Sequence, residues 1–299
     1  MSTQTPSRPV GVDEIKRAWR ALNAGEFRTG PVAGKGPRGR SVAADCTWSP
    51  ADGEHTIAVI GSAGSVGAST LALATGLAAA APVRVIECCS VTASGLGAAS
   101  TAELGLHPTE WRQGRRDHVL LERASEVLAG VEEVPLPTEA QDETQLSILD
   151  IGWEAGQLLA TDCWLAEAVR VADQIVLVTT ATVPGMRRAG VAMDLLAGYG
   201  QPEQIALAVR GPRRKKWPRG LEHAGGPAVR RALGTDRCVE IPEIRELAIK
   251  GLDSRPVPAP LISAARQLLE PAQLPADTSE SARPARGQQP RREVHPWMS

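Results

Sequence analysis

The sequence has few aromatic residues, which limits the kinds of core it can build. It contains one Phe, one Tyr and seven Trp in 299 residues, so a core dominated by aromatic packing is excluded. Its hydrophobic content of 42% instead predicts a core of Val, Ile, Leu and Ala. That amount of apolar material suffices for one sizeable α/β domain with tails.

An excess of one charge and a long hydrophobic run are also missing. The 33 basic and 34 acidic residues nearly cancel, so any surface for nucleic acid must be a local patch. No stretch approaches the roughly 20 apolar residues of a membrane span. The first residues lack the apolar segment of a secretion signal. We therefore expect a cytoplasmic protein that does not associate with membranes.

Cysteine pairs with metal-binding spacing are missing as well. The five cysteines include no C-x-x-C motif, which disfavours a zinc site. An odd number without such spacing is typical of reduced thiols in a protein core. The five residues are Cys46, Cys88, Cys89, Cys163 and Cys238.

Short strand patterns alternate with helical patterns between residues 54 and 270. The apolar runs are rich in β-branched residues and show no polar alternation, as in strands buried on both faces of a parallel sheet. The sequence therefore predicts a doubly wound, mostly parallel α/β sheet with helices on both faces. Strands are expected at 56–60, 83–86, 146–149, 174–179 and 205–209, and helices at 69–80, 116–129, 156–171, 185–198 and 257–270.

The segments that flank this domain have a different composition. We expect disorder over residues 1–10 and in the Pro-, Ser- and Arg-rich tail 271–299. Residues 11–28 predict a short amphipathic helix containing Trp19, followed by a Gly/Pro-rich linker over 29–53. This helix either packs on its own domain or binds a protein partner.

A glycine-rich turn, IGSAGSVGAST at residues 60–70, connects the first predicted strand to the first helix. In a phosphate-binding loop, successive backbone N–H groups and the positive end of the following helix surround the anion. The usual lysine is missing here, because Ala68 stands between Gly67 and Ser69. The candidate binding residues are Gly64, Ser65, Gly67, Ala68, Ser69 and Thr70.

The turn resembles the loop of the partition and septum-site-determining ATPases, the ParA/MinD-like family, which reads Lys-Gly-Gly-x-Gly-Lys-Thr/Ser. Both family lysines are alanine in this chain, at Ala63 and Ala68. Further segments are similar to family motifs in the same order. They are Val85–Ser90, Leu149–Gly152, Ala172–Thr180 and Val239–Pro242.

The resemblance implies a P-loop fold that binds ATP or ADP with Mg²⁺, forms a homodimer and works with a protein partner. It places Ser69 and Asp150 at the magnesium ion, and puts Glu87 and Cys89 where the family has two aspartates. Because phosphoryl transfer depends on positioned charge, the missing lysines predict a pseudo-ATPase. We expect a scaffold or positioning factor in plasmid or chromosome partition, or in DNA transfer.

Two alternatives remain open at this point. In the first, the protein is an atypical ATP-binding switch with weak hydrolysis, in which arginines such as Arg187 and Arg188 replace the lysines. In the second, it is a regulatory module or a DNA-binding module without sequence preference, and it binds no nucleotide. The family often has an adenine-reading Asn near residues 209–210, where this chain has Val and Arg.

The densest charge run in the sequence supports the DNA-binding alternative. Six of the ten residues at 210–219 are basic, and Trp217 lies among them. Such a segment can neutralise phosphates and stack on bases without sequence preference. It is also typical of a solvated loop or of a docking surface for an acidic partner. The candidate DNA-binding residues are Arg210, Arg213, Arg214, Lys215, Lys216 and Arg219.

Overall fold

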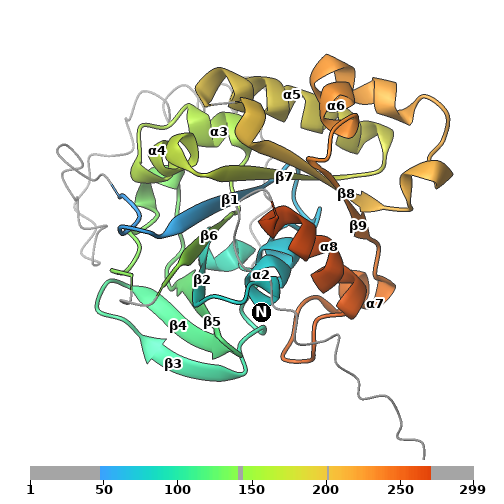
Figure 1. The fold of residues 1–299 in the computed structure, drawn as a ribbon. Coiled ribbons are helices and arrows are strands. Elements are labelled where there is room, and N and C mark those ends of the chain that lie inside the picture. Colours follow the sequence, from blue (N-terminus) through green and yellow to red (C-terminus); the bar gives the residue numbers. More distant parts are fainter. Residues whose placement is uncertain (1–47, 141–143, 201, 271–299) are drawn as a thin grey trace, which may run out of the picture. The chain divides into compact units, whose positions relative to one another are not determined.

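A single β-sheet forms the centre of the protein. The structure, a computed structural model, describes residues 48–140, 144–200 and 202–270. In these residues nine strands lie in the order β3-β4-β5-β2-β6-β1-β7-β8-β9 (Figure 1). They are β1 (His55–Gly61), β2 (Val83–Cys88), β3 (Ala102–Leu106), β4 (Trp111–Arg116), β5 (Val119–Ala124), β6 (Leu146–Ile151), β7 (Gln174–Thr180), β8 (Ile205–Gly211) and β9 (Cys238–Pro242).

The predicted sheet is confirmed. From β5 to β9 in this order every two adjacent strands are parallel, whereas β4 pairs antiparallel with both β3 and β5. β1 lies between β6 and β7, so the chain leaves it first toward one edge and later toward the other. Crevices at such a reversal point are where open α/β sheets bind ligands.

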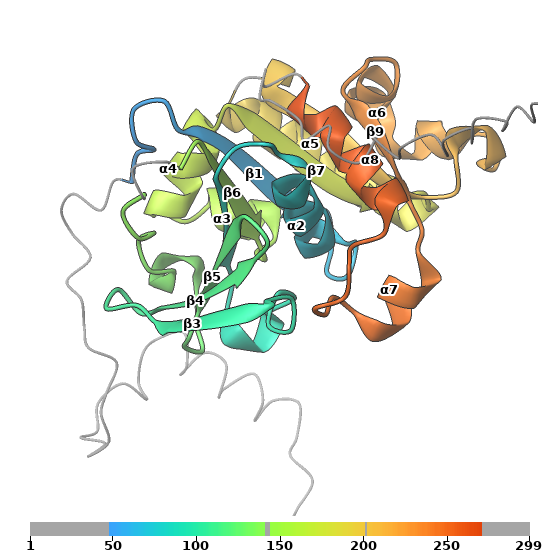
Figure 2. The same cartoon turned by 60° about the horizontal axis from the view of Figure 1, so that its bottom comes forward.

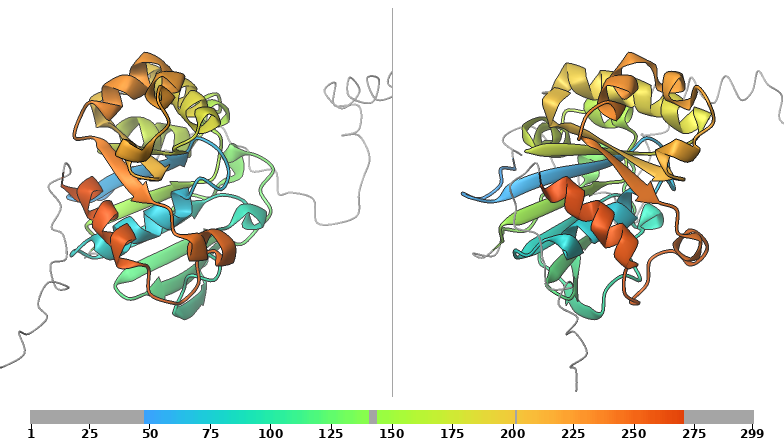
Figure 3. Two further views of the ribbon diagram at one scale, coloured as in Figure 1. Left: turned by 90° about the vertical axis from the view of Figure 1, so that its right-hand side faces the viewer. Right: turned by 45° about the vertical axis from the view of Figure 1, so that its right-hand side comes forward.

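Helices cover both faces of the sheet because successive strand residues point to opposite sides. Ile57 and Val59 belong to the core under α2 and α8, whereas Ala58 and Ile60 belong to the core under α3 to α6. Figures 1 and 3 show the two helical layers on either side. The helices are α2 (Ala68–Ala78), α3 (Ala155–Leu159), α4 (Trp164–Val171), α5 (Val183–Tyr199), α6 (Gly226–Leu233), α7 (Arg245–Lys250) and α8 (Ala259–Leu269).

One predicted helix is wrong. Residues 116–129 form the end of β4, the whole of β5 and a following loop. β5 pairs with β2 in the sheet, and Figure 2 shows β5 next to β4. Asp117, in the left-handed region at φ 51°, allows the tight reversal between the two antiparallel strands. A short apolar run has the same pattern in a buried strand as in a buried helix, so tertiary pairing decided this segment.

The remaining predicted elements overlap the observed ones. The predicted helix 156–171 is divided into α3 and α4 by a break at 160–163. Residues 1–28 and 271–299 lie outside the described residues, as does the predicted linker up to residue 47. Trp48, in the part of the predicted linker that the structure describes, packs on the domain. The centroids of its ring and of the Trp164 ring are 5.9 Å apart in an edge-on arrangement. Within the described ranges no helix is both long and apolar enough to cross a membrane.

Candidate phosphate-binding site

The glycine-rich turn connects the carboxyl end of β1 to the first residue of α2, as the sequence predicts. Val66 is buried and anchors the turn, whereas Gly64 and Ser65 are exposed at its tip. The Ser62 hydroxyl donates to Thr179 Oγ1 at 2.9 Å, which fixes the turn against β7. The loop is therefore held at its base and open at its tip.

The start of α2 leaves backbone donors available. Its N-cap residue is Gly67, in the left-handed region at φ 100°, and no side chain caps the helix. Ser65 also has a positive φ, 62°, which is uncommon for a residue with a Cβ. The first turn contains no acidic residue. Because the first N–H groups of a helix lack partners within it, this end can accept an anion.

Glu87 organises the loop that follows β2, next to the start of α2. Its carboxylate accepts hydrogen bonds from Ser94 Oγ at 2.6 Å and from the N–H groups of Gly95 and Leu96 at 2.6 and 2.9 Å. A Cβ built on Gly95 would lie 3.0 Å from Ser69 Oγ, so this loop packs closely against α2. Glu87 therefore has a structural role in the fold of the site.

Asp150 lies beside Glu87 in the register of β6 and β2, as the sequence motifs imply. Burial raises its pKa to about 8, the neighbouring Glu87 contributes to the rise, and a hydrogen bond from Ser69 opposes the shift. Asp150 Oδ2 is buried without a hydrogen-bond partner. At neutral pH the carboxyl is therefore mostly protonated in the folded protein.

Ser69 and Asp150 supply only part of the ligand set that a magnesium ion needs. Mg²⁺ is often held by one or two protein oxygens together with phosphate oxygens and waters. The Ser69 hydroxyl and the Asp150 carboxyl with which it interacts, whose Oδ2 has no other partner, provide such a pair. No cluster of three or more His, Cys, Asp or Glu side chains suited to a metal exists among the residues that the structure describes. The donor set therefore fits an ion that arrives with a polyphosphate.

The two cysteines near this site carry buried thiols. Cys88 and Cys89 are free and buried, and burial raises the pKa of each thiol above its ordinary value. Cys89 packs against the chain at Gly152, where an added Cβ would lie 2.5 Å from Cys89 Cβ. The neutral Cys89 side chain thus stands where the family resemblance implies an aspartate.

The sequence does not indicate that Arg210 lies next to the glycine-rich turn. This residue belongs to β8, but its Nη2 donates to the carbonyl oxygen of Ser65 in the glycine-rich turn, at 3.2 Å. Its Cδ lies 3.5 Å from the place where a Cβ on Gly67 would be. By contrast, Arg187 and Arg188 are exposed on α5. The structure therefore separates Arg210 from the rest of the predicted DNA-binding set.

The rest of the basic stretch is partly tied to the domain. Arg214 donates from Nη1 to the Leu233 carbonyl and from its N–H to Glu240. Trp217 is half-buried against the core, and its Nε1 donates to Pro212 O at 2.8 Å. Trp217 therefore stabilises the loop. The exposed cations that remain are Arg213, Lys215, Lys216 and Arg219.

Comparison with known proteins finds similarity only at the level of structure. No protein-family model and no curated protein matches the sequence. A ParA family ATPase from Chlorobium tepidum is 14% identical, with a TM-score of 0.40, over 73% of this chain and 92% of its own. MinD from Aquifex aeolicus is 18% identical, with a TM-score of 0.45, over 72% and 97%.

A third similar structure is a complex of a McdA variant from Cyanothece with ATP. It is 14% identical and has a TM-score of 0.44, over 74% of this chain and 97% of its own. The solved structures to which this chain is similar thus include ParA and MinD proteins, the family that its sequence motifs resemble.

Proposed function

We propose that this protein binds a nucleotide without hydrolysing it efficiently, and acts as a scaffold or positioning factor of the ParA/MinD type. One observation carries the proposal. The start of α2 behind Gly67 has no side-chain cap, which leaves its backbone N–H groups available, while both lysine positions of the resembled motif are alanine. A backbone cradle can still hold a phosphate, but hydrolysis needs positioned charges that these alanines do not supply.

The buried carboxyls support the same conclusion. Glu87 accepts hydrogen bonds from three protein donors, and Asp150 is mostly protonated at neutral pH. Neither is therefore a ready base for an attacking water. Magnesium, when it arrives with a nucleotide, would displace the proton of Asp150, would be held by Ser69 and the Asp150 carboxylate, and would neutralise phosphate charge. A role in plasmid or chromosome partition, or in DNA transfer, a homodimer and a partner bound through the Trp19 segment belong to the same proposal.

Fluorescent ATP and ADP provide the direct test. We expect saturable, magnesium-dependent binding by the full chain, with phosphate release close to the background rate. Ala68→Lys should tighten ATP binding by about 10- to 100-fold, because a charge-assisted hydrogen bond contributes about 1.5–3 kcal/mol. Ala51→Lys, which adds the same charge in the exposed turn before β1, should leave the affinity unchanged.

Two results would contradict this proposal. A flat titration at millimolar ATP and ADP would exclude a nucleotide-binding protein and favour the alternative without nucleotide. Rapid turnover by the unaltered chain would instead establish the atypical switch ATPase.

The exposed cations near β8 favour DNA as a second ligand. Arg213, Lys215, Lys216 and Arg219 lie within seven residues, and no ion pair involves any of them in the described part of the chain. Replacing all four by Ala should weaken binding to random duplex DNA. The slope of log K against log salt should fall by about 0.9 for each phosphate that the variant no longer neutralises.

A matched control removes the same charge from another surface. The exposed arginines Arg187, Arg188, Arg230 and Arg231 on α5 and α6 should be replaceable by Ala with little change in DNA affinity or salt slope. If both quadruple variants lose affinity equally, the basic stretch has no special role in DNA binding.

A further inference from the structure

Arg210 reaches from one part of the sheet to another to meet the glycine-rich turn. β7 separates its strand, β8, from β1, which leads into that turn. The side chain nevertheless lies over the turn, with Nη2 on Ser65 O at 3.2 Å and Cδ close to Gly67. The fold therefore brings the Arg210 guanidinium to a turn that follows a strand two places away in the sheet.

The surroundings of Arg210 leave its charge uncompensated. It is half-buried, and no ion pair to it exists among the described residues. Its guanidinium donates to a backbone carbonyl, which carries no net charge. The guanidinium also lies near the start of α2, which has no acidic residue in its first turn. Because a helix N-terminus is itself positive, this arrangement concentrates positive charge where an anion could relieve it.

A second, independent feature also points to a ligand at this place. Asp150 is 2% exposed, and its Oδ2 has no hydrogen-bond partner. Its side chain is hydrogen-bonded to Ser69 in the first turn of α2. Unpartnered buried polar atoms are rare in native proteins and call for an explanation. An anion with its own cation or bound water would satisfy both Arg210 and Asp150.

We propose that Arg210 is the phosphate-binding cation of this loop, in place of the lysines absent at residues 63 and 68, and that its ligand is a polyphosphate. The inference rests on the proposed nucleotide-binding function and extends it by naming the group that holds phosphate. Arg210 supplies no base for an attacking water, so slow hydrolysis is still expected. Guanidinium presents a planar set of donors that matches phosphate oxygens in a bidentate manner. On binding, Arg210 exchanges the Ser65 carbonyl for phosphate oxygens.

Three variants of the full chain test the assignment. Arg210→Ala should weaken binding of both fluorescent ATP and inorganic tripolyphosphate, the latter measured as a competitor, by about 10- to 100-fold. Arg210→Lys should recover part of each loss because it restores the charge without the bidentate geometry. The control is Arg112→Ala, which removes an exposed arginine of β4 and should leave both affinities unchanged. Thermal melts should confirm that all three variants fold.

Three outcomes would overturn the assignment while leaving nucleotide binding intact. Equal affinities in Arg210→Ala and the unaltered chain would show that Arg210 does not contact the ligand. A loss for ATP alone, with tripolyphosphate unchanged, would assign Arg210 to the base. Tighter binding in Arg210→Ala would show that the side chain obstructs the loop. If the unaltered chain binds neither ATP nor tripolyphosphate, both the assignment and the proposed function fail.

Discussion

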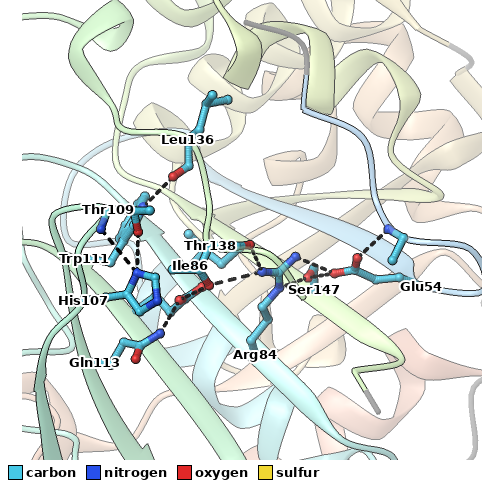
Figure 4. Close-up of polar contacts among 12 residues, drawn as sticks. Glu54, Arg84, Ile86, His107, Thr109, Trp111, Gln113, Leu136, Thr138 and Ser147 are labelled. Atoms are coloured by element: carbon cyan, nitrogen blue, oxygen red, sulfur yellow. Dashed lines mark hydrogen bonds and ion pairs between the residues drawn. The ribbon is translucent and has the colours of Figure 1, made fainter. Parts of the chain in front are cut away.

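Replacing Arg84 by methionine should lower the free energy of unfolding by about 3–5 kcal/mol, because buried carboxylates then lose their cation. The side chain is 2% exposed. Its guanidinium donates to Glu54 Oε1 at 2.8 Å, Ser147 Oγ at 2.6 Å and Thr138 O at 2.6 Å (Figure 4). Glu122 Oε2 lies 3.8 Å from Arg84 Nη1. Urea unfolding followed by Trp fluorescence measures the change.

Two further variants separate lost charge pairing from lost packing. Arg115→Met replaces an exposed arginine of β4 and should change stability by less than about 0.5 kcal/mol. The double variant Arg84→Met/Glu54→Gln should lose less free energy of unfolding than the sum of the losses of the two single variants, because one of the unpaired carboxylates is then replaced by a neutral amide. Strict additivity would mean that the charge pair is not the origin of the loss.

The second large effect is a pH dependence that Asp150 imposes on stability. Its pKa is about 8 in the folded chain, chiefly because of burial and then because of Glu87, against an ordinary value of 3.8. Below pH 3.8 both states are protonated. Between pH 3.8 and 8 only the unfolded state loses the proton, so stability falls by roughly 1.4 kcal/mol per pH unit. Above pH 8 the loss is complete.

Asp150→Asn removes this titration and isolates its contribution. Between pH 5 and pH 7.5 the stability of the variant relative to the unaltered chain should rise by roughly 3 kcal/mol. The measurement is urea unfolding across this range in a metal-chelating buffer, so that no cation binds the carboxylate. Asp52→Asn, at an exposed residue, serves as the control. Its free energy of unfolding should change with pH as that of the unaltered chain does. Parallel profiles for Asp150→Asn would show that Asp150 ionises normally.

Local pattern was sufficient to predict most of the parallel sheet. The runs at 56–60 and 174–179 are apolar throughout most of their length, and both became central strands buried on their two faces. The same pattern was ambiguous at 119–124, where VLLERA forms β5. The local sequence does not indicate that β5 can pair with the edge of β2. This pairing explains why the segment forms a strand and not the predicted helix.

The candidate site divides in the same way. The glycine-rich turn could be predicted without a structure, because its glycines, its hydroxyls and the absence of lysine are local features of residues 60–70. The sequence motifs also placed Asp150 and Glu87 at strand ends that meet in a parallel sheet.

The pairing of the buried charges, and the choice of polar groups that face the loop, depended on the packed fold. Arg84 follows a valine in a strand buried throughout, yet its partners come from the segment before β1 and from β5 and β6. Arg210 begins a basic run in the sequence, but its side chain lies on the turn 145 residues earlier. Charged side chains are long and their partners are distant in the chain, so only the folded arrangement brings them together. The hydrophobic period of a strand depends only on its own residues.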